Sequence, residues 1–166
     1  MRGCLSCLFL LVTFILSGPA QSADELQNWF HDPFFQISDA VPDCPMPAGP
    51  FVTERERTAE AHHRAERGTT CWLVGKCDRP TSYAYDQDIA SAFQKALENN
   101  HQFNKSSLWV TVQGRIVYIE GCAEENNLGR RIELFTMSLP YVELAVAKIR
   151  YDPLAKPPYA LMKSHE

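Results

Sequence analysis

The stretch LWVTVQGRIVYIEG, residues 108–121, decides the fold of this chain, because apolar and polar residues alternate along it on both sides of a central Gln113-Gly114 pair. Alternation with period two predicts β-strands, and glycine tolerates the positive φ that a tight hairpin turn demands. The stretch therefore predicts two antiparallel strands joined by a two-residue turn at Gln113 and Gly114.

A helix pattern precedes the hairpin. Asp86 stands at its start, where a side-chain oxygen can cap the free backbone amides of a helix N-terminus. Apolar residues then recur at every fourth position, which indicates a helix with one buried stripe. These residues are Ile89, Phe93 and Leu97.

A second helix pattern and a last strand follow the hairpin. Glu124 and Glu125 are placed where a helix N-terminus favours negative charge, and the helix is expected to end at Pro140. Its apolar stripe consists of Leu128, Ile132, Phe135 and Leu139. The run YVELAVAKIRY, residues 141–151, is rich in valine, isoleucine and tyrosine and lies between two prolines, so it predicts a third strand.

The spacing of these features resembles the BON domain family of bacterial envelope proteins. An acidic residue opens a helix, then strand, glycine, strand and glycine follow, and then a helix and a valine-led last strand. The strand and glycine positions are Val110, Val112, Gly114, Val117, Ile119 and Gly121. Tyr141 stands where the family usually has glycine, and Ala147 where asparagine is common, so the final turn is where this chain departs from the family pattern.

The resemblance covers residues 86–152 only. It implies an α+β fold, a small sandwich of α-β-β-α-β order with two helices on a three-stranded sheet. It also implies a non-enzymatic role at the cell envelope, with phospholipid interaction the usual proposal, and it implies no catalytic residues and no cofactor.

The N-terminus predicts export. Arg2 precedes an apolar run at residues 8–16, residues 17–19 break the run, and small residues follow. This order is typical of a signal peptide, and the run is far shorter than the roughly 20 residues that span a bilayer. We expect residues 1–23 to be removed, leaving a periplasmic chain without a transmembrane segment. A retained anchor is the alternative.

The charge of the mature chain argues against nucleic acid as a partner. Losing Arg2 leaves 15 of the 16 Lys and Arg against 20 Asp and Glu, a net charge of −5. Nucleic acid and anionic lipid are both negative and would be repelled at long range. Only a local basic patch could favour an anionic partner.

Four cysteines remain in the mature chain, and in an exported protein an even number of thiols predicts disulfides. Four cysteines allow three pairings. We favour Cys71 with Cys77, closing the loop CWLVGKC, and Cys44 with Cys122, tying the N-terminal region to the domain. The spacing of Cys71 and Cys77 is wider than a CxxC knuckle, so a zinc site is disfavoured and no metal is expected.

Residues 24–85 are interpreted as an N-terminal extension, and residues 153–166 as a C-terminal tail. An aromatic segment and a proline-rich linker, residues 41–50, open the extension. A helix follows, with Thr53 and Glu56 in capping-box spacing and Gly68 as its expected end. Within this helix, Glu60 and Arg64 have the spacing of an ion pair.

The histidines and acids give little indication of catalysis. His62 and His63 are adjacent, so on a helix they point about 100° apart and are interpreted as surface residues. His31 and Asp32 lack an accompanying nucleophile motif such as G-x-S-x-G. We therefore expect a binding protein and not an enzyme.

The expected turn places one set of hairpin side chains away from the helices. It pairs Trp109 with Tyr118 and Thr111 with Ile116, and apolar patches of this kind mark contact sites when they are exposed. Trp109, Thr111, Ile116 and Tyr118 are therefore the candidate binding surface. In the alternative interpretation, the extension covers this face, with Phe34, Phe35, Trp72 or Leu73 as the cover.

Two functional hypotheses result. In the first, the chain is an envelope-associated binding module that contacts phospholipid or an outer-membrane component through the sheet face. In the alternative, it is a periplasmic protein-protein adaptor, or an accessory subunit of an envelope machine, with the extension as its docking arm.

Overall fold

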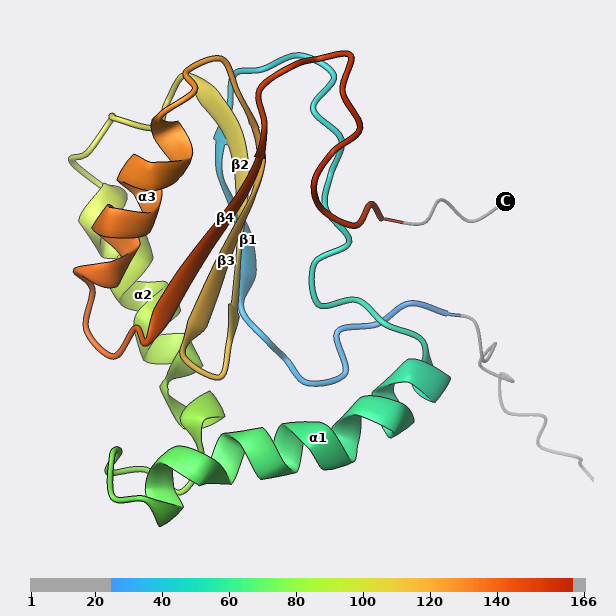
Figure 1. Ribbon diagram of the computed structural model, residues 1–166, viewed down its shortest axis with the longest axis vertical. Helices are drawn as coiled ribbons and strands as arrows, with labels where there is room; N and C mark the ends of the chain where they lie inside the picture. Colours follow the sequence, from blue (N-terminus) through green and yellow to red (C-terminus); the bar gives the residue numbers. More distant parts are fainter. Residues whose placement is uncertain (1–24, 163–166) are drawn as a thin grey trace, which may run out of the picture.

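The computed structural model describes residues 25–162 and shows an α+β fold in which helices cover one face of a four-stranded sheet (Figure 1). In chain order its elements are β1 (Phe34–Asp39), α1 (Glu54–Leu73), the 3-10 helix η1 (Ser82–Tyr85), α2 (Asp86–Leu97), β2 (Ser106–Gln113), β3 (Ile116–Ala123), α3 (Leu128–Met137) and β4 (Leu144–Arg150). The expected signal peptide, residues 1–23, and the last residues of the tail, 163–166, lie outside the described residues.

The sheet has the strand order β1-β2-β3-β4 over the described residues. β1, β2 and β3 are antiparallel neighbours, whereas β4 runs parallel to β3. The prediction of three strands was therefore one strand short, because the extension contributes β1 along the free edge of β2. The order α-β-β-α-β does occur from α2 to β4, but β1 and α1 precede it.

The hairpin turn lies one residue later than predicted, at Gly114 and Arg115, with φ of 62° and 70°. Positive φ at both central residues gives the turn a twist that matches the strands it joins. The carboxylate of Asp86 accepts hydrogen bonds from the backbone amides of Gly114 and Arg115, at 2.7 and 2.8 Å. Asp86, at the start of α2, therefore supports the left-handed backbone conformation of Arg115. The sequence pattern did not indicate that conformation.

Asp86 does not cap α2 as expected. Tyr85 occupies the cap position and makes no side-chain capping bond, while both oxygens of Asp86 bind the hairpin. Burial raises the pKa of Asp86 from 3.8 to about 6, although the two backbone amides and the charge of Arg64 oppose that rise.

The main core lies between the sheet and the pair α2 and α3 (Figure 1). The predicted stripes supply it, because Ile89, Phe93, Leu128 and Ile132 are almost wholly buried. Aromatic rings meet edge to face within it, including Phe93 with Phe135 at 5.5 Å between centroids. These contacts confirm the two helical stripes and the helix-facing side of the hairpin.

The expected start of the second helix was too early. α3 begins at Leu128, so Glu124 and Glu125 precede it, and Glu125 instead pairs with Arg131 at 2.6 Å. Before β4, Tyr141 has a φ of 67°. This left-handed conformation is the one that glycine adopts most readily, at the position where the BON pattern usually has glycine.

The helix of the extension, α1, has the predicted capping box of Thr53 and Glu56 but does not end at Gly68. It continues to Leu73. A Cβ at Gly68 would lie 2.6 Å from the Thr81 hydroxyl and 3.0 Å from the Tyr83 ring. The missing side chain of Gly68 therefore allows α1 to pack closely against η1.

A buried ion pair fastens α1 to the body. Arg64 donates to both oxygens of Asp32, at 2.6 and 3.0 Å, and does not pair with Glu60 as predicted. Its guanidinium lies between the rings of Phe30 and Tyr83, at 4.0 and 4.1 Å from their centroids. A tertiary contact therefore replaces the local pair that the spacing favoured.

Candidate functional site

The sheet face opposite the helices was the predicted binding surface, and the chain covers much of it. The cross-strand partners in the structure lie two residues away from those expected, so Thr111 lies opposite Tyr118 and Trp109 opposite Glu120. Because a shift of two residues preserves the face, all four candidate residues still share it with Gln113. The correction therefore changes the cross-strand pairs but not the surface.

Two segments from opposite ends of the described chain run side by side over this face (Figure 1). Pro47 forms an antiparallel bridge with Leu161, and the amide of Ala48 donates to the carbonyl oxygen of Ala160 at 2.8 Å. We call residues 46–48 and 160–162 the cover. Trp109, on the sheet, is only 8% exposed.

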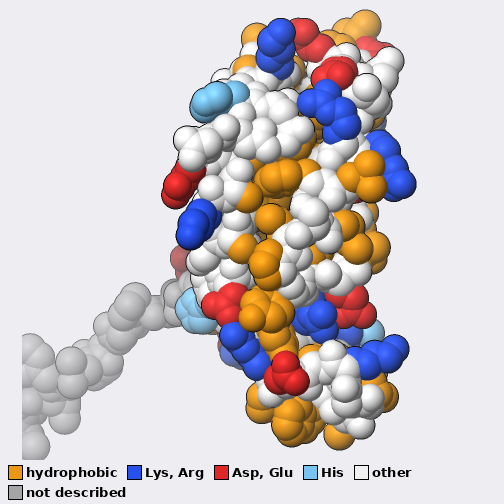
Figure 2. Space-filling model, turned by 90° about the vertical axis from the view of Figure 1, so that its left-hand side faces the viewer, with side chains coloured by type: hydrophobic (Ala, Val, Ile, Leu, Met, Phe, Trp, Pro, Cys, Tyr) orange, Lys and Arg blue, Asp and Glu red, His pale blue; other side chains and the backbone are white. Residues whose placement is uncertain are grey.

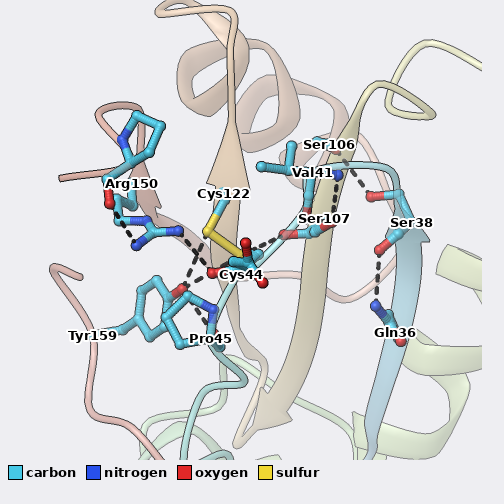
Figure 3. Close-up of a disulfide and its surroundings, with 12 residues drawn as sticks. Gln36, Ser38, Val41, Cys44, Pro45, Ser106, Ser107, Cys122, Arg150 and Tyr159 are labelled. Carbon is cyan, nitrogen blue, oxygen red and sulfur yellow. Dashed lines mark hydrogen bonds between the residues drawn. A yellow bond between two sulfur atoms is a disulfide. The ribbon is translucent and has the colours of Figure 1, made fainter. Parts of the chain in front are cut away.

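The cover is fastened by the disulfide between Cys44 and Cys122 (Figure 3). The hydroxyl of Tyr159 lies 3.7 and 3.6 Å from the two sulfur atoms and donates to the carbonyl oxygen of Pro45 at 2.9 Å. Burial raises the pKa of Tyr159 above its ordinary value. The bridge has the pairing favoured from the sequence, and so does the bridge between Cys71 and Cys77.

Of the residues considered as a cover, only one side chain approaches this role. Phe34 packs against Phe51 on the side of the cover, whereas Phe35 meets Phe93 of the helix-side core. Trp72 and Leu73 are exposed elsewhere. Sequence reasoning missed the contribution of the C-terminal segment, whose backbone pairs with residues 46–48, more than a hundred positions earlier in the chain.

A cleft of about 320 Å³ remains beside the cover, and Thr111 and Tyr118 line it together with Gln113, Glu120 and Lys148. Its two charged groups are already paired, at 3.2 Å between Lys148 Nζ and Glu120 Oε1. The ammonium also lies 5.5 Å from the centre of the Tyr118 ring. Of the predicted binding residues, the structure therefore brings two to a small polar cleft and buries Trp109.

Three consecutive apolar residues face solvent at the end of α1, whereas the exposed Leu134, Met137, Tyr141 and Leu144 are spaced from α3 to the start of β4. Trp72, Leu73 and Val74, which we call the apolar tip, are 48%, 77% and 58% exposed. Figure 2 shows hydrophobic side chains gathered at the lower end of the molecule, where α1 ends in Figure 1. The sequence had indicated a disulfide loop here and had offered Trp72 and Leu73 as a possible cover of the sheet face.

The backbone of the apolar tip is constrained by hydrogen bonds and by a disulfide. The amide of Gly75 donates to the carbonyl oxygen of Trp72, and the amide of Lys76 to that of Cys71, at 3.0 and 2.8 Å. With Gly75 at a φ of 68°, this pair of bonds is a Schellman motif. The bridge between Cys71 and Cys77 closes the same turn. The three apolar side chains are thus presented on a constrained loop.

The ionisable groups do not assemble a metal site within residues 25–162. No group of three His, Cys, Asp or Glu side chains there has a geometry that could hold a metal ion. His62 and His63 are exposed, and Asp32 is held by Arg64 and by the amide of Gln113 at 2.7 Å. Over the same described part of the chain, no helix is long and apolar enough to cross a bilayer.

Comparisons with protein-family models, with curated proteins and with solved structures each found no match.

Proposed function

We propose that this protein is an exported, non-enzymatic binding module of the cell envelope that contacts a phospholipid surface through the apolar tip. The observation that carries the proposal is the exposure of three consecutive apolar side chains on a disulfide-closed turn. The signal-like N-terminus and the resemblance of residues 86–152 to BON domains support an envelope location.

The size of the apolar tip favours a lipid surface over a folded protein as its partner. A stable protein interface buries about 800 Å² on each side, which is far more than three partly exposed side chains supply. A membrane surface needs only a few apolar groups that reach the boundary between headgroups and acyl chains. Tryptophan favours this boundary, because its ring is apolar and its N–H is a donor. Trp72 fits that role.

Liposome flotation of the mature protein tests the proposal. We expect the wild type to float with vesicles of phosphatidylethanolamine and phosphatidylglycerol, and the double variant Trp72→Ser/Leu73→Ser to remain at the bottom. The matched control is Leu154→Ser, which removes another exposed leucine, 96% accessible, far from the tip in the sequence. Equal flotation of the wild type and the double variant would contradict the proposal.

The adaptor hypothesis retains one supporting observation. α1 is 20 residues long, yet only Arg64 and Gly68 of the helix are buried. Most of its surface therefore stays open to a partner protein. Crosslinking in envelope fractions tests this alternative. The adaptor would be favoured over the lipid-binding module if the wild type crosslinked to a protein that the tip variant did not, and if the wild type also failed to float with vesicles.

A further inference from the structure

A groove runs directly beneath the apolar tip, between the last turns of α1 and the hairpin turn. It measures about 320 Å³, and Val74 of the tip forms part of its wall. The other lining residues are Arg67, Thr70, Cys71, Lys76, Ser82, Gly114, Ile116 and Glu143. The groove therefore combines two cations, two hydroxyl groups and one carboxylate with a lining that is mostly apolar.

The two cations differ in how they are held. Arg67 donates through Nε and Nη2 to the Tyr83 hydroxyl, at 3.2 and 2.8 Å, and it also interacts with the side chain of Tyr118, so its guanidinium is fixed at the wall of the groove. Lys76 is exposed, and its ammonium makes neither a hydrogen bond nor an ion pair within the described chain. One positioned cation and one unengaged cation thus border the same groove.

Ser82 gives an independent indication of a ligand. It is 4% exposed, and its Oγ has no hydrogen-bond partner among the described residues. The hydroxyl lies at the hairpin end of the groove, 3.1 Å from the position that a Cβ on Gly114 would take. A buried hydroxyl without a partner is unfavourable, and a ligand oxygen at this end of the groove would supply the missing acceptor.

Two acidic groups lie in or near the groove, and they differ in how closely the chain contacts them. Glu143 lies 3.8 Å from Arg115. Asp86, under the hairpin turn, accepts the amides of Gly114 and Arg115 with its two oxygens. Two cations, Arg67 and Lys76, and one carboxylate, Glu143, therefore line the groove, so its formal charge is positive despite the acidic composition of the whole chain.

We propose that this groove binds a phosphate group, with Arg67 and Lys76 facing its negative oxygens and the Ser82 hydroxyl donating to one of them. A lipid headgroup and a small soluble phosphate ester share this chemistry. The lipid source rests on the proposed function, since the apolar tip would bring a membrane surface to the mouth of the groove. The phosphate chemistry itself does not depend on that function.

Two arms of one experiment separate these sources. In the first, glycerol 3-phosphate is titrated into the mature protein and amide chemical shifts are followed by NMR. We expect shifts at Gly114, Lys76 and Ser82, with affinity about 10-fold weaker for Lys76→Gln and several-fold weaker for Ser82→Ala. Lys156→Gln, which changes an exposed lysine on the C-terminal tail, is the matched control and should bind as the wild type does.

In the second arm, the same variants are floated with vesicles containing phosphatidylglycerol. Weaker flotation of Lys76→Gln, with Lys156→Gln unchanged, supports the headgroup as the source. Phosphate binding without flotation of the wild type would overturn the membrane function but retain the groove as a site for soluble phosphates. No shifts with glycerol 3-phosphate, or equal affinity of the wild type and Lys76→Gln, would overturn the phosphate site. Ser82→Ala keeps the test interpretable, because the hydroxyl that it removes has no hydrogen-bond partner among residues 25–162.

Discussion

Replacing Trp109 by alanine tests whether the cover is part of the folded protein. Trp109 is 8% exposed on the sheet face away from the helices, so its ring is buried by segments that lie outside the predicted domain. A buried aromatic side chain removes about 150–250 Å² from water, which corresponds to about 4–6 kcal/mol at about 25 cal/mol per Å². The cover can relax partly into the gap, so we expect a loss of about 3–5 kcal/mol.

Urea denaturation of the oxidised mature protein, followed by far-UV circular dichroism, measures this loss. Trp72→Ala provides a matched control, since it truncates the same side chain at a position that is 48% exposed. That variant should remain within about 1 kcal/mol of the wild type. If Trp109→Ala lost no more stability than Trp72→Ala, the cover would not pack against the sheet as described.

Three further predictions concern the disulfides, the buried carboxyl group of Asp86 and the buried ion pair of Arg64. Replacing Cys44 and Cys122 by serine should lower the free energy of unfolding by about 4 kcal/mol, because this bridge spans 78 residues. Replacing Cys71 and Cys77 by serine should cost only about 2 kcal/mol, because that bridge spans six residues. Urea titrations of the two double variants measure the difference. Asp86 has a folded-state pKa raised to about 6 by burial, so it retains a proton that the unfolded chain releases above pH 4. The stabilisation that results from this proton should be full below pH 4 and should decrease by roughly 2–3 kcal/mol as the pH rises through 6. Denaturation curves recorded from pH 4 to 7 measure this change in the free energy of unfolding. The change should disappear in Asp86→Asn. Arg64→Ala should cost about 3–5 kcal/mol, since it leaves the carboxylate of Asp32 buried without its partner, and a calorimetric melting temperature equal to that of the wild type would contradict this.

The sequence predicted best the features that depend on local periodicity. The stripe around Phe93, the stripe around Ile132 and the alternation in the hairpin each repeat with the period of their own element, so neighbours along the chain are sufficient to identify them. The capping box of Thr53 and Glu56 is equally local, and the structure confirms it. The two favoured disulfide pairings also occur in the structure.

The errors arose where a distant partner decides the conformation. The turn moved to Gly114 and Arg115 because Asp86 binds both amides, although arginine rarely adopts positive φ. Strand β1 exists because the edge of β2 accepts it. Gly68 was expected to end a helix, but its role depends on the approach of η1. None of these contacts has a signature in the residues adjacent to it.

The candidate site was predicted only in part, for a similar reason. The alternation of the hairpin correctly grouped Trp109, Thr111 and Tyr118 on one face. It carried no information on what lies above that face, because the cover comes from residues 46–48 and 160–162. The exposed run at Trp72 was visible in the sequence, but burial of hydrophobic residues is the usual expectation and it was assigned to a cover.

The bridge between Pro47 and Leu161 also sets an order of events during folding. It joins positions 114 residues apart (161 less 47), so it can form only after Leu161 has been synthesised. The hairpin and its helices depend on closer neighbours and can assemble earlier. Until the C-terminal segment arrives, the indole of Trp109 stays accessible to solvent and to other unfinished chains. Truncation before Tyr159 would make that transient state permanent and would yield an aggregation-prone product.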